Sequence, residues 1–369
     1  MEQNQGLHTA GQNMSEELLH PRENEGFLLP ESWQFDVGIE SIVFKKAEEI
    51  DEWGNALSRY RVNMSDGTRL GMNVCEPKER ATDIPIIETP AWFTNLHGFN
   101  EHSQRAFGAI GFPSILVGHV GEERDSYVRE IGQFLFKPWK TVQEMRSISL
   151  ARQAHNMLEI LQYPNLGMEL DKEYVFIHGN SRGAMVQFPF VFMARERGLD
   201  VTFAMPVAPC FAEGLGKETI QELRATPNKE VGNVARLAVR NLFDMAGTGA
   251  STVNLSPRSL AYEFAHTDSL LNGDAGRFAP HTPTDQDMLI VAYANDLAGQ
   301  KEKWEALYED HPGVYVRGVP GAHLSIADKR TKAYVMRTFD VIGQQLHDGA
   351  QPKDLDLSHI RRKLSIVQD

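Results

Sequence analysis

The pattern of hydrophobic and polar positions changes along the chain. Residues 1–30 are rich in Gln, Asn, Glu and Gly and show no apolar period, which is typical of a mobile arm. From Ser41 onward, apolar and polar residues alternate, and Asp66-Gly67 separates two of these alternating runs. Alternation around an Asp-Gly pair predicts an antiparallel hairpin. We therefore expect the folded part of the chain to open with antiparallel strands.

Short, nearly continuous apolar runs follow the hairpin and alternate with longer stretches of helical period. These runs lie at 92–96, 114–118, 174–178, 201–208, 288–294 and 314–319. Strands that are apolar on both faces and separated by helices are typical of a parallel sheet covered on both sides. The pattern predicts an α/β fold with a mostly parallel central sheet.

One interval between two of these runs is far longer than a strand crossover needs. It separates the runs at 201–208 and 288–294 and holds several helical stretches divided by Gly, Pro and Ser. We interpret residues 212–285 as a helical cap inserted into the core. The predicted division is then an arm at 1–30, a core at 31–211 and 286–348, the cap, and a C-terminal tail at 349–369.

Composition narrows the classes of protein. The 369 residues are 41% hydrophobic and 24% charged, which is ordinary for a globular chain. With 37 Lys and Arg against 50 Asp and Glu, the net charge of −13 disfavours a nucleic-acid partner. No apolar stretch is long enough to span a membrane.

Cysteine usage and the N-terminal residues bear on the compartment. Cys75 and Cys210 lie in apolar runs without CxxC spacing, so we expect buried thiols rather than a disulfide or a zinc site. The N-terminal residues have neither a basic segment nor an apolar segment of a secretion signal, which favours a cytoplasmic location. The sequence leaves open whether the chain forms a homo-oligomer.

The sharpest chemical signal is Gly179-Asn180-Ser181-Arg182-Gly183, which directly follows the apolar run at 174–178 and precedes a helical pattern. A serine hydroxyl is a weak nucleophile that needs exposure, a base and donors for an oxyanion. A tight turn from strand to helix exposes the serine, and it requires residues without Cβ two positions before and after. Gly179 and Gly183 meet that requirement.

This motif in this context resembles the nucleophile turn of the α/β-hydrolases, a superfamily that includes esterases and lipases. The likeness covers about residues 40–345 apart from the cap. The resemblance implies a triad in the chain order nucleophile, acid, histidine, with the acid and the histidine each after a later strand. Asp296 after the run at 288–294 fits the acid, and Glu213 is a weaker candidate. His323 follows the run at 314–319 and fits the base.

The resemblance also implies an oxyanion hole built from two backbone N–H groups. One belongs to Arg182, directly after the nucleophile. For the other we choose Phe99 in His97-Gly98-Phe99-Asn100, where Gly98 lets the backbone turn inward. Gly98 is also expected to contact substrate, together with Phe243 and Met245 from the apolar side chains of the cap.

Other polar residues in the sequence have less specific interpretations. The spacing of His102 and His119 matches no metal motif, so we interpret both as solvated loop residues. The side chain of Arg182 has two interpretations, a clamp for an anionic substrate or a partner of a surface acid. The predicted chemistry requires neither a metal nor a cofactor.

These residues together predict a serine hydrolase for a small carboxylic ester or related acyl compound with an apolar group. Relatives with the same triad cleave amides, lactones or C–C bonds, or transfer the acyl group to another acceptor, and the sequence leaves these alternatives open. A further alternative is an inactive binding protein on a hydrolase scaffold. Reaction of Ser181 with a fluorophosphonate would separate an enzyme from such a scaffold.

Overall fold

The computed structural model describes most of the core and the region after it. The described residues are 34–91, 96, 99–120, 145, 148–164, 166, 168–210, 265, 279–296, 299–321 and 329–361. The predicted arm at 1–30 and nearly all of the predicted cap at 212–285 lie outside them. Within the described part of the chain, no helix is both long and apolar enough to cross a membrane.

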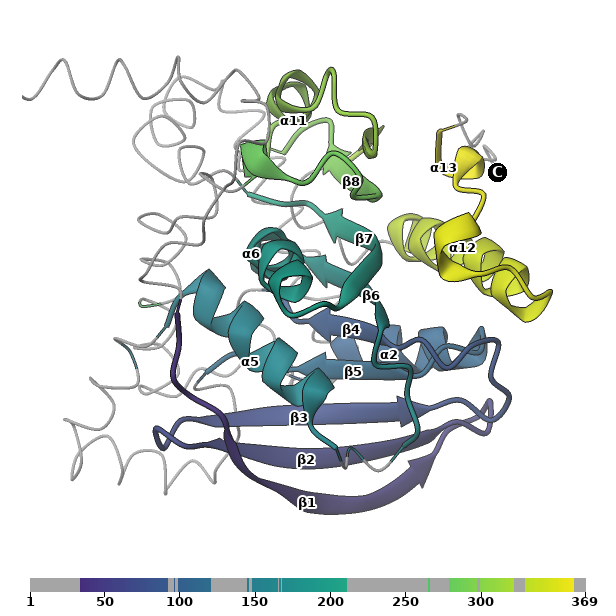
Figure 1. Ribbon diagram of the computed structural model, residues 1–369. Helices are drawn as coiled ribbons and strands as arrows, with labels where there is room; N and C mark the ends of the chain where they lie inside the picture. Colours follow the sequence, from purple (N-terminus) through teal and green to yellow (C-terminus); the bar gives the residue numbers. More distant parts are fainter. Residues whose placement is uncertain are drawn as a thin grey trace, which may run out of the picture.

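A single mixed sheet runs through the described part of the molecule (Figure 1). Its strand order is β1-β2-β3-β5-β4-β6-β7-β8-β9. The pairs β1–β2, β2–β3 and β3–β5 are antiparallel, and the five remaining pairs, from β5–β4 to β8–β9, are parallel. The strands are β1 Ile39–Ile50, β2 Ala56–Met64, β3 Arg69–Glu76, β4 Ile86–Thr89, β5 Ser114–Val117, β6 Tyr174–Asn180, β7 Asp200–Val207, β8 Met288–Tyr293 and β9 Val314–Val319. The predicted α/β class is confirmed.

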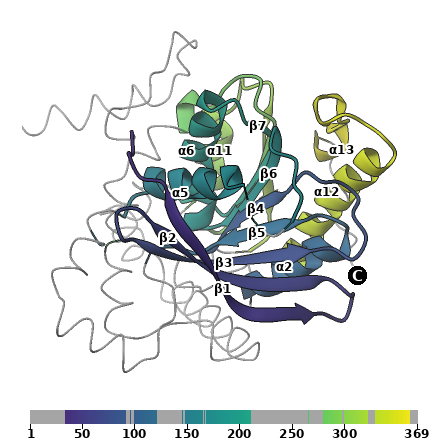
Figure 2. The same ribbon diagram turned by 60° about the horizontal axis from the view of Figure 1, so that its bottom comes forward.

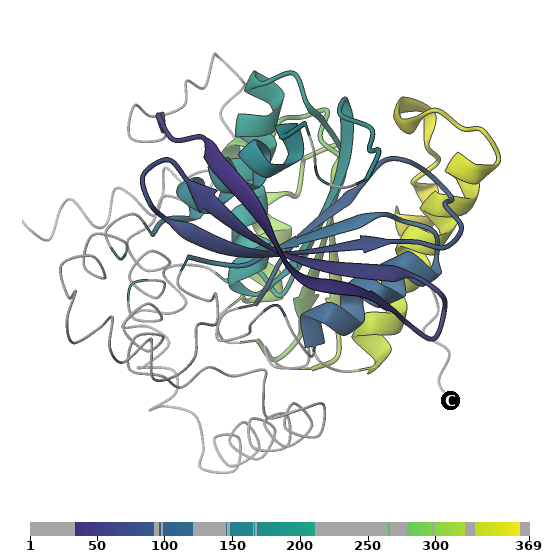
Figure 3. The same cartoon turned by 90° about the horizontal axis from the view of Figure 1, so that it is seen from below.

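Helices cover both faces of the sheet, as seen from below in Figure 3. The helices are α2 Phe99–Ala109, α5 Leu150–Gln162, α6 Arg182–Glu196, α11 Lys301–Leu307, α12 Lys329–His347 and α13 Ser358–Arg361, with 3₁₀ turns η3 Ala279–His281 and η5 Pro352–Asp354. Side chains of α5, α6 and α11 form one hydrophobic cluster with the sheet, and side chains of α2 and α12 form a second. Strands β6 and β8 are therefore buried on both sides, which explains their continuous apolar sequence.

The antiparallel edge is formed as the sequence predicts. Strands β2 and β3 are joined by a turn in which Gly67 has φ of 82°, a conformation that glycine adopts without a steric penalty. Strand β1 pairs with β2 and forms the edge of the sheet that comes forward in Figure 2. Both cysteines are free and buried, as expected.

The strand expected at 92–96 is placed differently. The strand between β5 and β6 is β4, at Ile86–Thr89, and residues 92–95 lie outside the described residues. The four residues of β4 are all buried, including Glu88. A carboxylate in so short a run, between Pro85 and Pro90, hides the strand from a search for apolar periods.

The chain continues to pack against the core after α12. Leu357 and Ile360 are buried in the cluster on the α2 and α12 face. On the other face Ala279, in η3, belongs to the cluster beside α11, and the Thr282 hydroxyl lies 2.9 Å from that of Tyr308. The described parts of the predicted tail and cap thus both extend the core.

Candidate active site

Ser181 lies in a sharp turn between strand β6 and helix α6. Its backbone has φ of 53° and ψ of −119°, a region that a residue with a side chain enters only under strain. Its N–H donates to the carbonyl oxygen of Val207 at 2.8 Å, which ties the turn to the end of β7. Such strain persists only where the surroundings enforce it, and it is concentrated at functional sites.

The two glycines of the motif are required by close packing. A Cβ at Gly179 would lie 2.7 Å from the carbonyl carbon of Gly183, and a Cβ at Gly183 would lie 2.7 Å from the carbonyl oxygen of Pro90 and collide with that of Thr89. Real Cβ atoms are not found at such distances from backbone atoms. The turn therefore sits directly on the end of β4, and the predicted role of both glycines is confirmed.

Ser181 is 5% exposed, and its side chain lies beside a thiol. Its Oγ is 3.8 Å from Sγ of Cys210, which follows strand β7. Ala208, in the same segment, has φ of 51°. Among the described non-glycine residues, Ser181 and Ala208 are the two with positive φ. Two strained backbone positions thus lie next to each other at the carboxyl ends of β6 and β7.

Asp296 is buried just after strand β8, at the same edge of the sheet. Its Oδ1 accepts a hydrogen bond of 3.0 Å from the N–H of Gly299. Gly299 packs against the carbonyl of Pro209, in the segment that also carries Cys210. The Ser181 turn and the Asp296 loop therefore both contact the short segment that leaves β7.

The other predicted site residues are less fully defined. His323, Gly98, Phe243 and Met245 lie outside the described residues, as does the alternative acid Glu213. Phe99 is the first residue of helix α2. On the side of His323, the described chain ends at Gly321, whose carbonyl accepts a hydrogen bond of 2.9 Å from the N–H of Asn295. The chain thus lies beside the Asp296 loop two residues before His323.

The solvated position expected for His119 is wrong, and the side chain of Arg182 lies in the interior rather than at the surface. Arg182 is 1% exposed and His119 is fully buried. Nη1 of Arg182 lies 2.6 Å from Nδ1 of His119. Burial follows from the position of Arg182 at the start of a helix packed between β6 and the end of β4, which sequence spacing alone does not reveal.

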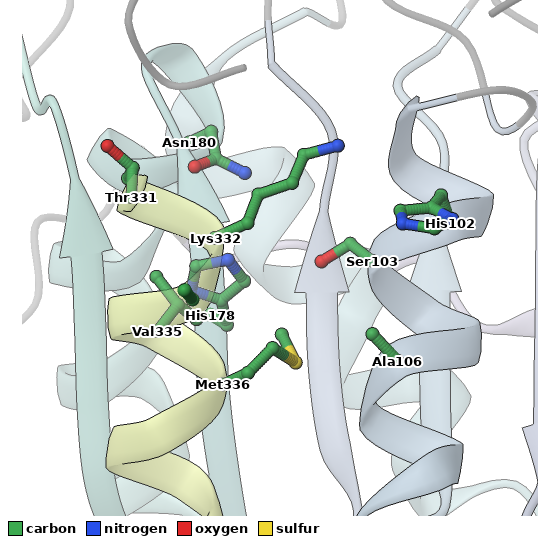
Figure 4. A pocket seen from close by; sticks show the side chains of 10 residues that line it. His102, Ser103, Ala106, His178, Asn180, Thr331, Lys332, Val335 and Met336 are labelled. Carbon is green, nitrogen blue, oxygen red and sulfur yellow. The ribbon is translucent and has the colours of Figure 1, made fainter. Parts of the chain in front are cut away.

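A cavity of about 110 Å³ with a mixed polar and apolar lining lies between helices α2 and α12 (Figure 4). Its polar lining comes from α2, β6 and α12, namely His102, Ser103, His178, Asn180, Thr331 and Lys332. Neither Ser181 nor Asp296 lines it. Asn180, which directly precedes Ser181, is among the described residues that line it.

Burial controls the charges around this cavity. It lowers the pKa of His178 to about 4, so that ring is neutral at pH 7. Glu88 is the register partner of His178 across β4 and β6, and burial raises the pKa of its carboxyl group well above the usual range. Burial also lowers the pKa of Lys332. Sequence reasoning missed this group, and the available signal was His178 inside the apolar run at 174–178.

Metal ligands are not gathered in the described part of the structure. No group of three or more His, Cys, Asp or Glu side chains is placed there to hold an ion.

Comparisons with known proteins add the fold class. No family model matches the chain, and the search of curated proteins finds no match. Among solved structures, a probable hydrolytic enzyme from Pseudomonas aeruginosa PAO1 aligns with a TM-score of 0.51 and 13% identity, over 82% of this chain and 94% of that one. A thermophilic esterase from Thermogutta terrifontis aligns with a TM-score of 0.49 and 11% identity, over 77% of this chain and 96% of the esterase. An enol-lactonase from Burkholderia xenovorans LB400 aligns with a TM-score of 0.49 and 14% identity, over 74% of this chain and 96% of that one.

The sheet order and the strand-to-helix turn at Ser181 define the α/β-hydrolase fold. The expected fold is therefore confirmed. At these identities the likeness concerns the fold and not the reaction.

Proposed function

We propose that this protein is a serine hydrolase that cleaves a carboxylic ester or a related acyl compound. The observation that carries the proposal is the conformation of Ser181, a strained serine between β6 and α6 whose flanking glycines leave no room for a Cβ. A fold maintains such a conformation where the hydroxyl is needed at a defined point.

The proposed reaction uses Ser181, His323 and Asp296. Ser181 Oγ attacks the acyl carbon while His323 accepts its proton, and His323 then protonates the leaving alcohol. An acyl-enzyme forms, and a water deprotonated by His323 hydrolyses it. Asp296 orients the imidazole and stabilises its charged form. The hydrogen bond from Asn295 to Gly321 supports this set, because it brings the chain leading to His323 beside the Asp296 loop.

The developing oxyanion would be stabilised by the backbone N–H groups of Arg182 and Phe99. Both residues are the first of a helix, α6 and α2 respectively. In the first helical turn the N–H groups have no acceptor within the helix, and the helix dipole favours negative charge there. Two helix starts that follow β6 and β4, which are neighbours in the sheet, support this assignment.

The proposed substrate is a small molecule with an apolar acyl or alcohol group. Phe243 and Met245 of the predicted cap, with Gly98, would contact that group. A panel of p-nitrophenyl esters that differ only in the acyl chain tests this preference, and fastest turnover of charged acyl groups would contradict it.

The central test combines Ser181→Ala with covalent labelling. We expect at least a ~10⁴-fold loss of kcat for p-nitrophenyl acetate, because a triad without its nucleophile retains little catalysis. A fluorophosphonate should modify the native protein at Ser181. Ser58→Ala, on strand β2, is the matched control and should react normally. Unchanged turnover in Ser181→Ala would refute the assignment, and failure of the native protein to react would favour an inactive binding scaffold.

A further inference from the structure

Arg182 and His119 form a buried pair next to the nucleophile. Nη1 of Arg182 lies 2.6 Å from Nδ1 of His119. A guanidinium group has only donors, so Arg182 donates and Nδ1 of His119 accepts. The imidazole is therefore neutral and carries its proton on Nε2.

The second ring nitrogen of His119 contacts the end of strand β4. Nε2 donates to the carbonyl oxygen of Pro90 at 2.8 Å, which requires the same tautomer as the contact with Arg182. One neutral ring therefore connects the residue after Ser181 with the residue after β4. Gly183 packs on the same carbonyl, so the turn and the strand end are held at two points.

The backbone around His119 is itself anchored. The preceding residue, Gly118, donates from its N–H to the carbonyl of Gly71 at 2.9 Å and accepts from Nε2 of Gln153 at 3.2 Å. These bonds tie the residue before His119 to strand β3 and helix α5. The ring therefore contacts Arg182 and Pro90 from a fixed position.

We propose that His119 is a positioning residue that fixes the Arg182 arm of the proposed oxyanion hole against the end of strand β4. The inference rests on the function proposed above. That arm is the backbone N–H of Arg182, and the His119 ring contacts the end of β4 at the carbonyl oxygen of Pro90. His119 is fully buried and acts through these two neighbours. Preorganised donors stabilise the transition state because they need not move when charge develops.

The protein contains a matched control at the other end of helix α6. Nε2 of His155 lies 2.6 Å from the carbonyl oxygen of Val37, and Nδ1 lies 2.8 Å from Nη2 of Arg197. This is the same combination of arginine, buried imidazole and backbone carbonyl. It lies beyond the C-terminal end of α6, whereas Ser181 precedes the N-terminal end.

The test compares His119→Ala and His119→Gln with His155→Ala and His155→Gln. In His119→Ala we expect kcat to fall about tenfold or more while KM stays within about twofold, because the donors act in the transition state. Glutamine carries one acceptor and one donor on a planar group, so His119→Gln should recover most of kcat. Both alanine variants should lower Tm, and the His155 variants should keep kcat.

The affinity for a trifluoromethyl ketone inhibitor distinguishes a positioning role of His119 from a merely structural one. The ketone adds to the serine and places an oxyanion against the two N–H groups. Its affinity should fall in His119→Ala by about the same factor as kcat and stay unchanged in His155→Ala. Fluorophosphonate titration counts competent sites, so each kcat refers to folded enzyme.

Three results would overturn the inference. They are normal kcat per titrated site in His119→Ala, a loss of kcat that His155→Ala shares, or a loss confined to KM. If His119→Ala does not fold, Arg182→Met removes the same hydrogen bond together with the buried charge, and normal kcat in that variant would also overturn it. If Ser181→Ala retains turnover, the proposed function fails and this inference with it. Loss of turnover in Ser181→Ala beside a normal His119→Ala refutes only the role of His119.

Discussion

Replacing Gly183 by alanine tests whether packing at the turn sets the geometry of the site. Within the first turn of a helix, a change from glycine to alanine ordinarily stabilises the protein by up to about 1 kcal/mol. Here the new Cβ would lie 2.7 Å from the carbonyl oxygen of Pro90 and closer still to that of Thr89. Both are backbone atoms, so either β4 or the start of α6 must move.

We expect Gly183→Ala to lower the free energy of unfolding. Overpacking costs about 1–3 kcal/mol, and this exceeds the gain in helix propensity. A displacement of the start of α6 against β4 also moves the N–H of Arg182, a proposed oxyanion donor, so kcat should fall about tenfold or more. Urea unfolding followed by circular dichroism measures the first effect, and ester hydrolysis per titrated site measures the second.

Gly198→Ala is the control for this prediction. Gly198 lies just beyond the other end of α6, with φ of 71°, and a Cβ added there would meet no atom within 4 Å. Its replacement should cost about 1 kcal/mol of backbone strain and leave kcat unchanged. The reasoning is refuted if Gly183→Ala is as stable as the native protein and fully active.

Three further predictions concern the acid, the buried imidazole and the core. Asp296→Asn should lower kcat about 10⁴-fold, because a neutral asparagine no longer stabilises the charged imidazole of His323. The rate of ester hydrolysis measures the loss. The folded-state pKa of His178, about 4, lies below its unfolded value near 6.5, so its contribution to stability is present above pH 6.5 and is lost as the pH falls towards 4. Urea unfolding should show that His178→Gln removes about 2 kcal/mol of the stability difference between pH 7.5 and pH 5. Phe339→Ala should cost about 3–5 kcal/mol in the same assay, because its ring contacts those of Phe107, Phe112, Phe176 and Phe203.

Each of these has a control or a contradicting result. Asp171→Asn, in the loop before β6, is the control for Asp296→Asn and should keep full activity. If the two variants have equal kcat, Asp296 is not part of the proposed triad. An unaltered pH dependence in His178→Gln would show that another group controls stability in this range. Phe44 is 54% exposed, so Phe44→Ala should cost about 1 kcal/mol or less, and a similar cost at Phe339 would contradict the packing argument.

The conformation of the turn at Ser181 could be predicted from sequence because it depends on residues that are adjacent in the chain. Gly179, Ser181 and Gly183 lie between an apolar run and a helical pattern, and this order determines the turn. The strand pattern likewise predicts the α/β class and the hairpin, since each depends on a period of two or on a continuous apolar run. The positions of Asp296 and His323 came from the resemblance, and the structure describes only the first of them.

The sequence by itself thus determined the class of the fold, the hairpin and the turn that carries Ser181. Only the tertiary structure decided which segment forms the strand β4, because the burial of Glu88 depends on partners from distant parts of the chain. The same holds for Arg182 and His119, which are 63 positions apart and meet because β4, β5 and β6 are neighbours in the sheet. Periodicity shows which face of an element is buried, and contacts between elements show what each buried polar group pairs with.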